Sequence, residues 1–297
     1  MDDPNPPQPL ATSQTLAPGL YLVATPIGNL EDITLRALRV LGSVDRIACE
    51  DTRQTQKLLH HFGIRTPTVS YHMHNETSRA EELVAELKTG ARIAVVSDAG
   101  TPGISDPGGQ IALAAIAAGV TVFPIPGANA AISGLIASGL PTDRFTFHGF
   151  LPAKEGARRT ALERLPRDGG TLVFYEAPHR IVDTLADVEA TFGANQHVVI
   201  GRELTKLHEE FLRGPVGELR TVLAARASVR GEIVLMLAPI ALEASAGQAT
   251  SIVAEVAAMM KAEGLGEMDA LKRVARERGI GKSEAYRELQ REQKRLR

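Results

Sequence analysis

The chain has 297 residues, of which 44% are hydrophobic, and its formal net charge at pH 7 is −2. No apolar run approaches the roughly 20 residues that span a membrane, and the one cysteine, Cys49, excludes an internal disulfide and a Cys-rich zinc site. This charge balance excludes a polycation, so binding to nucleic acid must rest on a local basic patch. The cysteine usage is typical of a reducing compartment, and we expect a cytoplasmic protein that makes no contact with membranes.

The N-terminus is rich in proline. Five of the first eighteen residues are prolines, and this stretch lacks both the basic start and the long apolar run of a signal peptide. We therefore predict a disordered tail over residues 1–18.

A repeated strand–loop–helix pattern follows the tail. Apolar runs predict strands at residues 19–25, 45–49, 68–72, 92–97 and 120–125. Helical patterns lie between these strands, and the last one covers residues 130–140. The alternation predicts a largely parallel sheet with helices on both sides, in a domain spanning residues 19–150.

The second half of the chain also mixes strands and helices. Strands are predicted at residues 171–175, 197–200 and 231–238, with a helix over residues 179–192, and these form a second α/β domain at residues 151–240. Residues 250–297 are helical in pattern, and from Gly266 onward they hold ten Lys or Arg against six Asp or Glu. This predicts a small helical module with a basic face.

Four loops each follow a predicted strand of the first sheet, at residues 25–29, 50–53, 98–108 and 126–130. Such loops converge on one edge of a parallel sheet, where ligands bind. The stretch from Ser97 to Gly109 holds four glycines and two prolines, which allow backbone N–H groups to approach a ligand closely. Asp98 and Asp106 could accept hydrogen bonds from ribose hydroxyls or an ammonium group, or serve only as turn or cap residues.

Two charged groups lie beside these loops in the predicted fold. In the sequence from Glu50 to Arg53, Arg53 could grip a phosphate and Asp51 could orient a hydroxyl; alternatively, the group forms its own salt bridge with Thr52 as helix cap. A second group, at the end of the strand at 171–175 and just after the domain joint, comprises Glu176, His179, Arg180, Lys154, Arg158 and Arg159. No P-loop, dinucleotide fingerprint, nucleophile elbow or zinc-protease motif is present, so we expect no metal site.

Four motifs carry a resemblance to a known family. They are LVATPIGNLEDIT (residues 22–34), CEDTR (49–53), SDAGTPGISDP (97–107) and FYEAPHR (174–180). In this order they resemble the bacterial small-subunit ribosomal RNA (cytidine-2′-O-)-methyltransferase I family, which lies within the tetrapyrrole-methylase superfamily. The similarity runs from about Gly19 to Ala238, and the tail resembles the family's C-terminal helical domain.

The resemblance implies two α/β domains of tetrapyrrole-methylase type, a cleft between them that binds S-adenosylmethionine, and a homodimer. It implies that the donor contacts Asp98, Gly100, Thr101, Pro102, Gly103, Asn129, Ala130, Tyr175 and Gly231. The first loop departs from the glycine-rich, acid-ended loop of the tetrapyrrole enzymes, because Pro26-Ile-Gly-Asn29 stands there. This difference argues against a corrinoid or porphyrin substrate.

We therefore predict S-adenosylmethionine-dependent 2′-O-methylation of a cytidine ribose in 16S ribosomal RNA, in the decoding region of the small subunit. Asp51 and Glu176 are candidate bases for the hydroxyl proton. Phosphate contacts are expected from the C-terminal basic face and from Arg53, Lys154, Arg158, Arg159, His179 and Arg180. Two alternatives remain: a methyltransferase of the same fold that acts on a tetrapyrrole or other small molecule, and a ligand-gated RNA-binding protein without catalysis.

Overall fold

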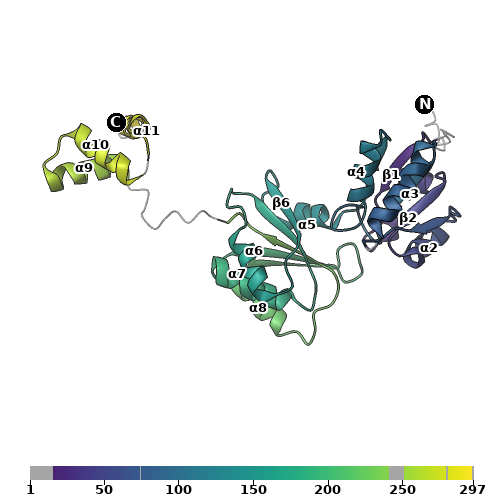
Figure 1. The fold of residues 1–297 in the computed structure, drawn as a ribbon. Coiled ribbons are helices and arrows are strands. Elements are labelled where there is room, and N and C mark those ends of the chain that lie inside the picture. The colour runs from purple at the N-terminus through teal and green to yellow at the C-terminus, as the bar shows by residue number, and fades with distance from the viewer. Residues whose placement is uncertain (1–15, 74, 241–250, 279, 296–297) are drawn as a thin grey trace, which may run out of the picture. The chain divides into compact units, whose positions relative to one another are not determined.

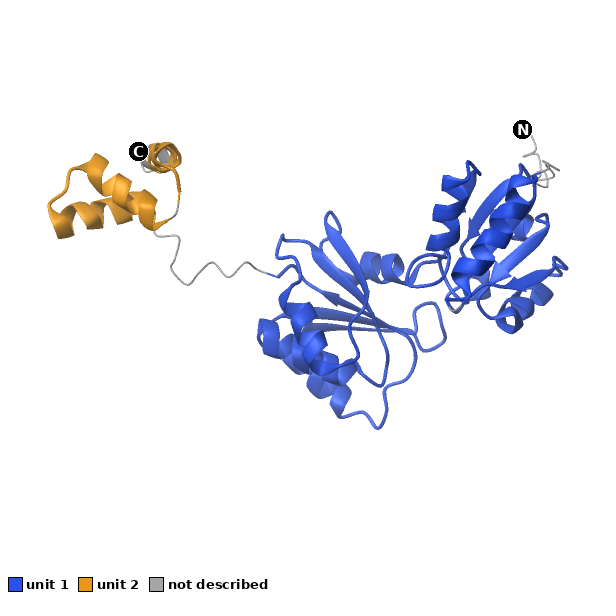
Figure 2. Cartoon of the chain, viewed as in Figure 1, with its two compact units in different colours: residues 1–240 blue, residues 241–297 orange. Residues whose placement is uncertain are grey.

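The computed structural model describes residues 16–297, except for residues 74, 241–250, 279 and 296–297. Most of the tail predicted at residues 1–18 therefore lies outside the described residues. The chain divides into two compact units, residues 1–240 and residues 241–297 (Figure 2). Each unit has its own core.

The first unit begins with a five-stranded, fully parallel sheet in the order β3-β2-β4-β1-β5 (Figure 1). Its strands are β1 (Gly19–Val23), β2 (Arg46–Cys49), β3 (Thr68–Ser70), β4 (Arg92–Val96) and β5 (Val122–Ile125). Its connections contain a 3-10 turn, η1 (Leu30–Asp32), and the helices α1 (Leu35–Leu41), α2 (Thr52–His61), α3 (Glu76–Lys88) and α4 (Gly109–Ala117). The predicted parallel sheet is confirmed.

Helices cover both faces of this sheet because successive strand residues point to opposite sides. In β1, Tyr21 and Val23 pack with α1 and α2, whereas Leu20 packs with α3 and α4. In β2, Ile47 joins the first of these cores and Ala48 joins the second. Burial on both faces explains why these strands read as continuous apolar runs.

A second five-stranded sheet has the order β6-β7-β10-β8-β9. Its strands are β6 (Phe145–Phe150), β7 (Thr171–Glu176), β8 (His197–Arg202), β9 (Glu210–Pro215) and β10 (Ile233–Leu237). The helices are α5 (Ala130–Ser138), α6 (Glu155–Glu163), α7 (Ile181–Phe192) and α8 (Val216–Ala224). Only the β6–β7 pair is parallel among the pairs of this sheet, so its mixed character differs from that of the first sheet.

This sheet is also covered on both faces. Helices α6, α7 and α8 share one core with it, and α5 packs on the other face through Ala131 and Leu135. Both α5 and β6 fall within the first domain as predicted, residues 19–150, yet in the structure both pack with the second sheet. The two sheets, each covered by helices, together with the helical C-terminal region confirm the predicted fold class.

The second unit is a three-helix module made of α9 (Ile252–Glu263), α10 (Glu267–Glu277) and α11 (Lys282–Arg295). Its core contains Ile252, Val256, Leu271, Val274 and Leu289. Arg278 joins the helices by ion pairs to Glu255 and Glu288. Across the described part of the chain, no helix combines the length and the apolar character needed to cross a bilayer.

Candidate functional site

The loop between β4 and α4 has a backbone that glycine makes possible. Gly100, Gly103 and Gly108 have φ values of 80°, 82° and 139°, in the region that side chains disfavour. A Cβ at Gly108 would lie 3.0 Å from the backbone nitrogen of Gly103. Ser105 also has a positive φ, 63°, although it is not glycine. Backbone strain of this kind concentrates at functional sites, and the loop is therefore a candidate site on structural grounds.

This loop is fixed to the loops that follow β1 and β5. Thr25 and Gly100 exchange backbone hydrogen bonds of 2.8 and 3.1 Å. The Thr101 hydroxyl donates to the Ala128 carbonyl at 3.1 Å, and the Asn129 amide donates to Thr101 Oγ1 at 3.3 Å. These bonds join three of the four loops predicted to converge, and the fourth is joined to them because the Asp51 backbone N–H donates to Asp98 Oδ1 at 3.0 Å.

A cavity of about 400 Å³ lies against the β4–α4 loop and is closed by residues of the second sheet. Its size falls within the range of small-molecule sites. Of the residues predicted to contact a donor, Asp98, Gly100, Thr101, Ala130 and Tyr175 line this cavity.

Four predicted donor residues do not line the cavity: Pro102, Gly103, Asn129 and Gly231. The Asn129 side chain is used locally, because its Oδ1 caps α5 by accepting from the Ile132 amide at 3.1 Å. Gly231 lies directly before a lining residue, Glu232, and a Cβ there would meet the Glu203 side chain at 2.3 Å. Gly231 therefore supports the wall by allowing a close approach.

Several lining residues were not predicted as site residues. They include Ile27, Ile104, Phe150, Leu204, Glu232 and Val234. Phe150, Leu204 and Glu232 lie at or beside the ends of strands in the second sheet. Ligands in such folds lie beyond the carboxyl ends of strands. This rule could have indicated Phe150, at the end of β6, but the sequence patterns do not predict β6 as a strand.

Asp106 is the notable carboxylate of the cavity. It lines the wall, it is half-buried, and within the described residues it accepts no hydrogen bond and forms no ion pair. Burial and the negative charges of Glu50, Asp98 and Glu232 raise the pKa of Asp106 to about 6. A carboxylate with these properties can accept a proton at neutral pH.

The first candidate base, Asp51, is occupied by local contacts. Its Oδ1 accepts from the Arg53 amide at 2.8 Å, so Asp51, and not Thr52, is the N-cap of α2. The Arg53 guanidinium donates to both carboxylate oxygens, at 3.1 and 2.9 Å, and these hydrogen bonds lower the pKa of Asp51 to about 2. Asp51 does not line the cavity, although its backbone N–H donates to Asp98 Oδ1 at 3.0 Å. This geometry leaves Asp51 a weak proton acceptor.

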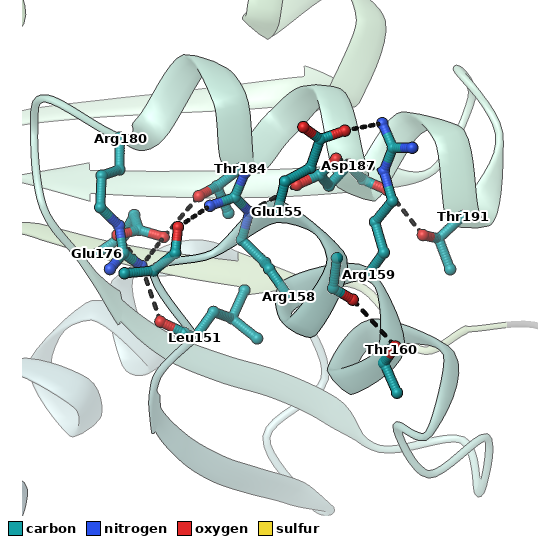
Figure 3. A network of polar contacts seen from close by, with 12 residues as sticks. Leu151, Glu155, Arg158, Arg159, Thr160, Glu176, Arg180, Thr184, Asp187 and Thr191 are labelled. Atoms are coloured by element: carbon teal, nitrogen blue, oxygen red, sulfur yellow. Dashed lines mark hydrogen bonds and ion pairs between the residues drawn. The ribbon is translucent and has the colours of Figure 1, made fainter.

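The second candidate base, Glu176, lines the cavity but is only 3% exposed. Its oxygens accept from the Ala177 amide at 2.7 Å, the Thr184 hydroxyl at 2.6 Å and Arg180 at 2.9 and 3.1 Å (Figure 3). Arg180 also donates to the Leu151 carbonyl at 2.8 Å. Glu176 and Arg180 therefore hold β7, α7 and the end of β6 together, and neither is free for a substrate.

The predicted basic cluster separates into buried and exposed members (Figure 3). Arg158 is 4% exposed, and its guanidinium donates to Asp187 at 2.6 Å and to the Ala153 carbonyl at 3.1 Å. Arg159 also donates to Asp187, at 2.7 Å, but its side chain is 49% exposed. The expected phosphate role of Arg158 is contradicted by this burial, because its charge is already paired inside the second core. Lys154 and His179 are exposed.

Comparison with known proteins agrees with this architecture. The family model of Tetrapyrrole (Corrin/Porphyrin) Methylases matches residues 19–220. The ribosomal RNA small subunit methyltransferase I of Halalkalibacterium halodurans is 50% identical over 271 residues, covering 90% of this chain and 93% of that protein. The Escherichia coli O157:H7 protein of the same name is 51% identical over 219 residues, covering 73% and 77%.

Solved structures show the same fold at lower identity. The uroporphyrin-III-C-methyltransferase of Thermus thermophilus matches with a TM-score of 0.52 and 22% identity, covering 74% of this chain and 94% of that chain. A diphthine synthase matches with a TM-score of 0.56 and 16% identity, covering 74% and 89%.

Proposed function

Because the chain belongs to the ribosomal RNA small subunit methyltransferase I family, we propose that it methylates a cytidine ribose 2′-oxygen in the decoding region of 16S ribosomal RNA. S-adenosylmethionine is the proposed donor, and when bound it supplies an electrophilic methyl group. The observation that supports the 2′-oxygen as acceptor is the Asp106 carboxylate in the cavity wall, which has no hydrogen-bond or ion-pair partner in the part of the chain that the structure describes. A hydroxyl acceptor must lose its proton during methylation, and it therefore needs such a base.

The cavity fits the proposed donor in size and chemistry. Apolar side chains of Ile27, Ile104 and Val234 can contact the adenine and the aliphatic part of the donor. The carboxylates of Asp98 and Glu232 lie in the same wall and can attract its positively charged groups. The glycine-rich β4–α4 loop brings backbone groups to the surface of the cavity, and so provides polar contacts without bulky side chains.

Within this proposal, Asp106 acts as the base in place of Asp51 and Glu176. Asp106 would accept the proton of the ribose 2′-hydroxyl while the oxygen–methyl bond forms and the methyl–sulfur bond of the donor breaks, with the neutral thioether as the leaving group. Burial, followed by the negative charges of Glu50, Asp98 and Glu232, raises the pKa of Asp106 and so makes it basic enough for this task. The loop around Ser105 and Gly108 holds the carboxylate in the wall.

The test is methyl transfer by the full chain. Small ribosomal subunits from a strain lacking this enzyme are incubated with the protein and labelled donor, and the modified nucleoside is identified. We expect 2′-O-methylcytidine in the decoding region of 16S ribosomal RNA. Label on a base, or on a porphyrin-type acceptor in place of RNA, would contradict the proposal. Binding of donor and RNA without any transfer would instead favour a non-catalytic binding protein.

The three-helix unit is the proposed RNA-binding module. Helices α10 and α11 carry six exposed cations with described side chains: Lys272, Arg273, Arg276, Lys282, Arg287 and Arg291. Some of these are paired, such as Lys272 with Asp269 at 2.7 Å, but the pair is exposed and contributes little. These positions support the interpretation of the module as a phosphate-binding surface.

Deleting residues 251–297 should weaken binding to 16S ribosomal RNA and leave donor binding in the first unit unchanged. The reason is that the three-helix unit has a core of its own, so removing it leaves the first unit, which holds the donor cavity, with its own core residues complete. Filter binding of RNA and calorimetry with donor measure the two affinities. Unchanged RNA affinity after the deletion would contradict the proposed role of the module.

We also propose that the protein is a homodimer. Leu113 and Ile116 lie one turn apart on α4 and are 65% and 63% exposed, so they form a neighbouring pair of exposed apolar side chains on this helix. A second copy of the chain would cover them. Light scattering on the purified protein checks this, and a monomer mass would contradict it.

A further inference from the structure

A second concave surface is formed by residues beside the first sheet. It is a groove of about 630 Å³ between α2 and the segment that enters β3. Helix α2 contributes Arg53, Gln56, Lys57 and His60, at the spacing that places residues on one helix face. The opposite wall comes from residues 64–68 and includes Arg65.

The groove is basic, and nothing acidic lines it. Arg53, Lys57, His60 and Arg65 are exposed, and no Asp or Glu is among the lining residues. The sequence itself has no Asp or Glu between Asp51 and Glu76, although acidic residues number 35 in the whole chain. A chain with a net charge of −2 therefore concentrates positive charge here, of which only Arg53 has an acidic partner, Asp51, among the described residues. This is the electrostatic pattern of a phosphate-binding surface.

The cations of the groove are available to a ligand. Arg65 forms no hydrogen bond or ion pair with any residue that the structure describes. Lys57 is bonded only to the neutral Gln54 side chain, at 3.1 Å, among the described residues. Arg53 is paired with Asp51, but its side chain is 85% exposed, and exposed pairs of this kind are weak. A phosphate can therefore compete for all three side chains.

One end of the groove is linked to the cavity wall by a hydrogen bond. Its lining begins at Arg53, two residues after Asp51, whose backbone N–H donates to the cavity residue Asp98 at 3.0 Å. From there α2 runs for ten residues, or about 15 Å at 1.5 Å per residue. This length corresponds to roughly four nucleotides at the 3.4 Å rise of a stacked strand. A nucleic acid strand with one ribose at the cavity can thus follow α2 toward Arg65.

We propose that this groove binds the phosphate backbone of the substrate RNA on one side of the methylated nucleotide, with Lys57 and Arg65 as its principal contacts. The proposal rests on the proposed function, since it takes RNA as the substrate. It extends that function, because it adds to the C-terminal module a second RNA-binding surface, next to the cavity. It also explains why the first sheet's edge carries a basic helix.

The test compares two double charge reversals in the full chain. Lys57→Glu with Arg65→Glu should weaken binding to 16S ribosomal RNA and reduce the slope of log affinity against log salt by about 1.4, for two single-strand phosphate contacts. The matched control is Arg36→Glu with Arg39→Glu, which makes the same charge change at exposed positions of α1 that do not line the groove. The control should keep the wild-type slope. Donor affinity, measured by calorimetry, should be unchanged in both variants.

A slope equal to that of the wild type in the Lys57/Arg65 variant would overturn the proposal, as would an equal loss in the control. Lysine-reactive labelling of the wild-type protein gives a second measurement that does not depend on a variant's folding. RNA should protect Lys57 from the reagent, and undiminished labelling of Lys57 in the RNA complex would overturn the proposal. Failure of the proposed function looks different, because the wild-type protein would then not methylate or bind 16S ribosomal RNA at all.

Discussion

Replacing Asp106 by asparagine should slow methyl transfer to 16S ribosomal RNA by about 10²–10⁴-fold, the usual contribution of a general base. Asparagine has nearly the same shape, so the cavity and the donor affinity should be preserved. The loss should appear in single-turnover rates with bound RNA and donor, where binding no longer limits the reaction. Calorimetry with the donor gives the matching affinity.

The pH dependence tests the same assignment. Asp106 acts as a base only when it is ionised, and its pKa is raised to about 6 by burial and by the charges of Glu50, Asp98 and Glu232. The wild-type rate should therefore rise with pH through about 6 and level off above it, whereas the asparagine variant should lack this step. Asp106→Glu should recover part of the rate, because it restores a carboxylate. Asp143→Asn, at an exposed position outside the cavity, is the matched control and should behave as wild type.

Stability offers a further sign. The pKa of Asp106 in the folded protein lies above the ordinary value for aspartate, so ionisation of this carboxylate lowers the free energy of unfolding. This loss grows as pH rises above the normal pKa range for Asp. Asp106→Asn should therefore be slightly more stable than wild type at pH 8, by thermal unfolding. A variant that is fully active, or that keeps the pH step near 6, would contradict the role of Asp106.

Replacing Arg158 by alanine should lower the free energy of unfolding by about 3–5 kcal/mol, the cost of removing one partner of a buried ion pair. The partner, Asp187, is 2% exposed and accepts from both Arg158 and Arg159. In the variant, its buried carboxylate would retain only the contact with Arg159. Urea unfolding of the full chain, followed by circular dichroism, measures the change.

Arg159→Ala is the control for this prediction. Arg159 contacts the same carboxylate at 2.7 Å, but its side chain is half exposed, so its removal should cost only about 0–1 kcal/mol. The double variant Arg158→Met with Asp187→Leu should recover much of the loss, since apolar replacement of both partners removes the uncompensated charge. Equal effects of the two single arginine variants would refute the assignment of Arg158 to the core.

Much of the fold could be predicted from the sequence because local patterns carried it. The five parallel strands read as apolar runs, and the glycine- and proline-rich loops marked their ends. The family predicted from the four motifs is confirmed by relatives that are about half identical over most of the chain. Strand β9 is not predicted, because its Glu, Arg, Gly and Pro residues give no apolar run. It is held as a strand by its antiparallel pairing with β8.

The site was harder to predict because side-chain partners are set by tertiary contacts. Arg158 and Lys154 are close in sequence and equally basic, yet only packing against α7 shows that Arg158 is buried on Asp187. Glu176 lines the cavity, as its predicted place at a strand end suggested, but Arg180 and Thr184, four and eight residues further along the chain, occupy its oxygens. From the sequence, Asp106 is either an acceptor for hydroxyl or ammonium groups or a turn or cap residue, since its burial and its acidic neighbours are invisible there.

The hydrogen bond from the Asp51 backbone to Asp98 has a thermodynamic consequence. It connects the N-cap of α2, beside the start of the groove, to Asp98 in the wall of the cavity. If filling the cavity changes the affinity of the groove by some factor, then filling the groove must change the affinity of the cavity by the same factor. Donor titrations with and without RNA, and RNA titrations with and without donor, should therefore return one and the same coupling free energy.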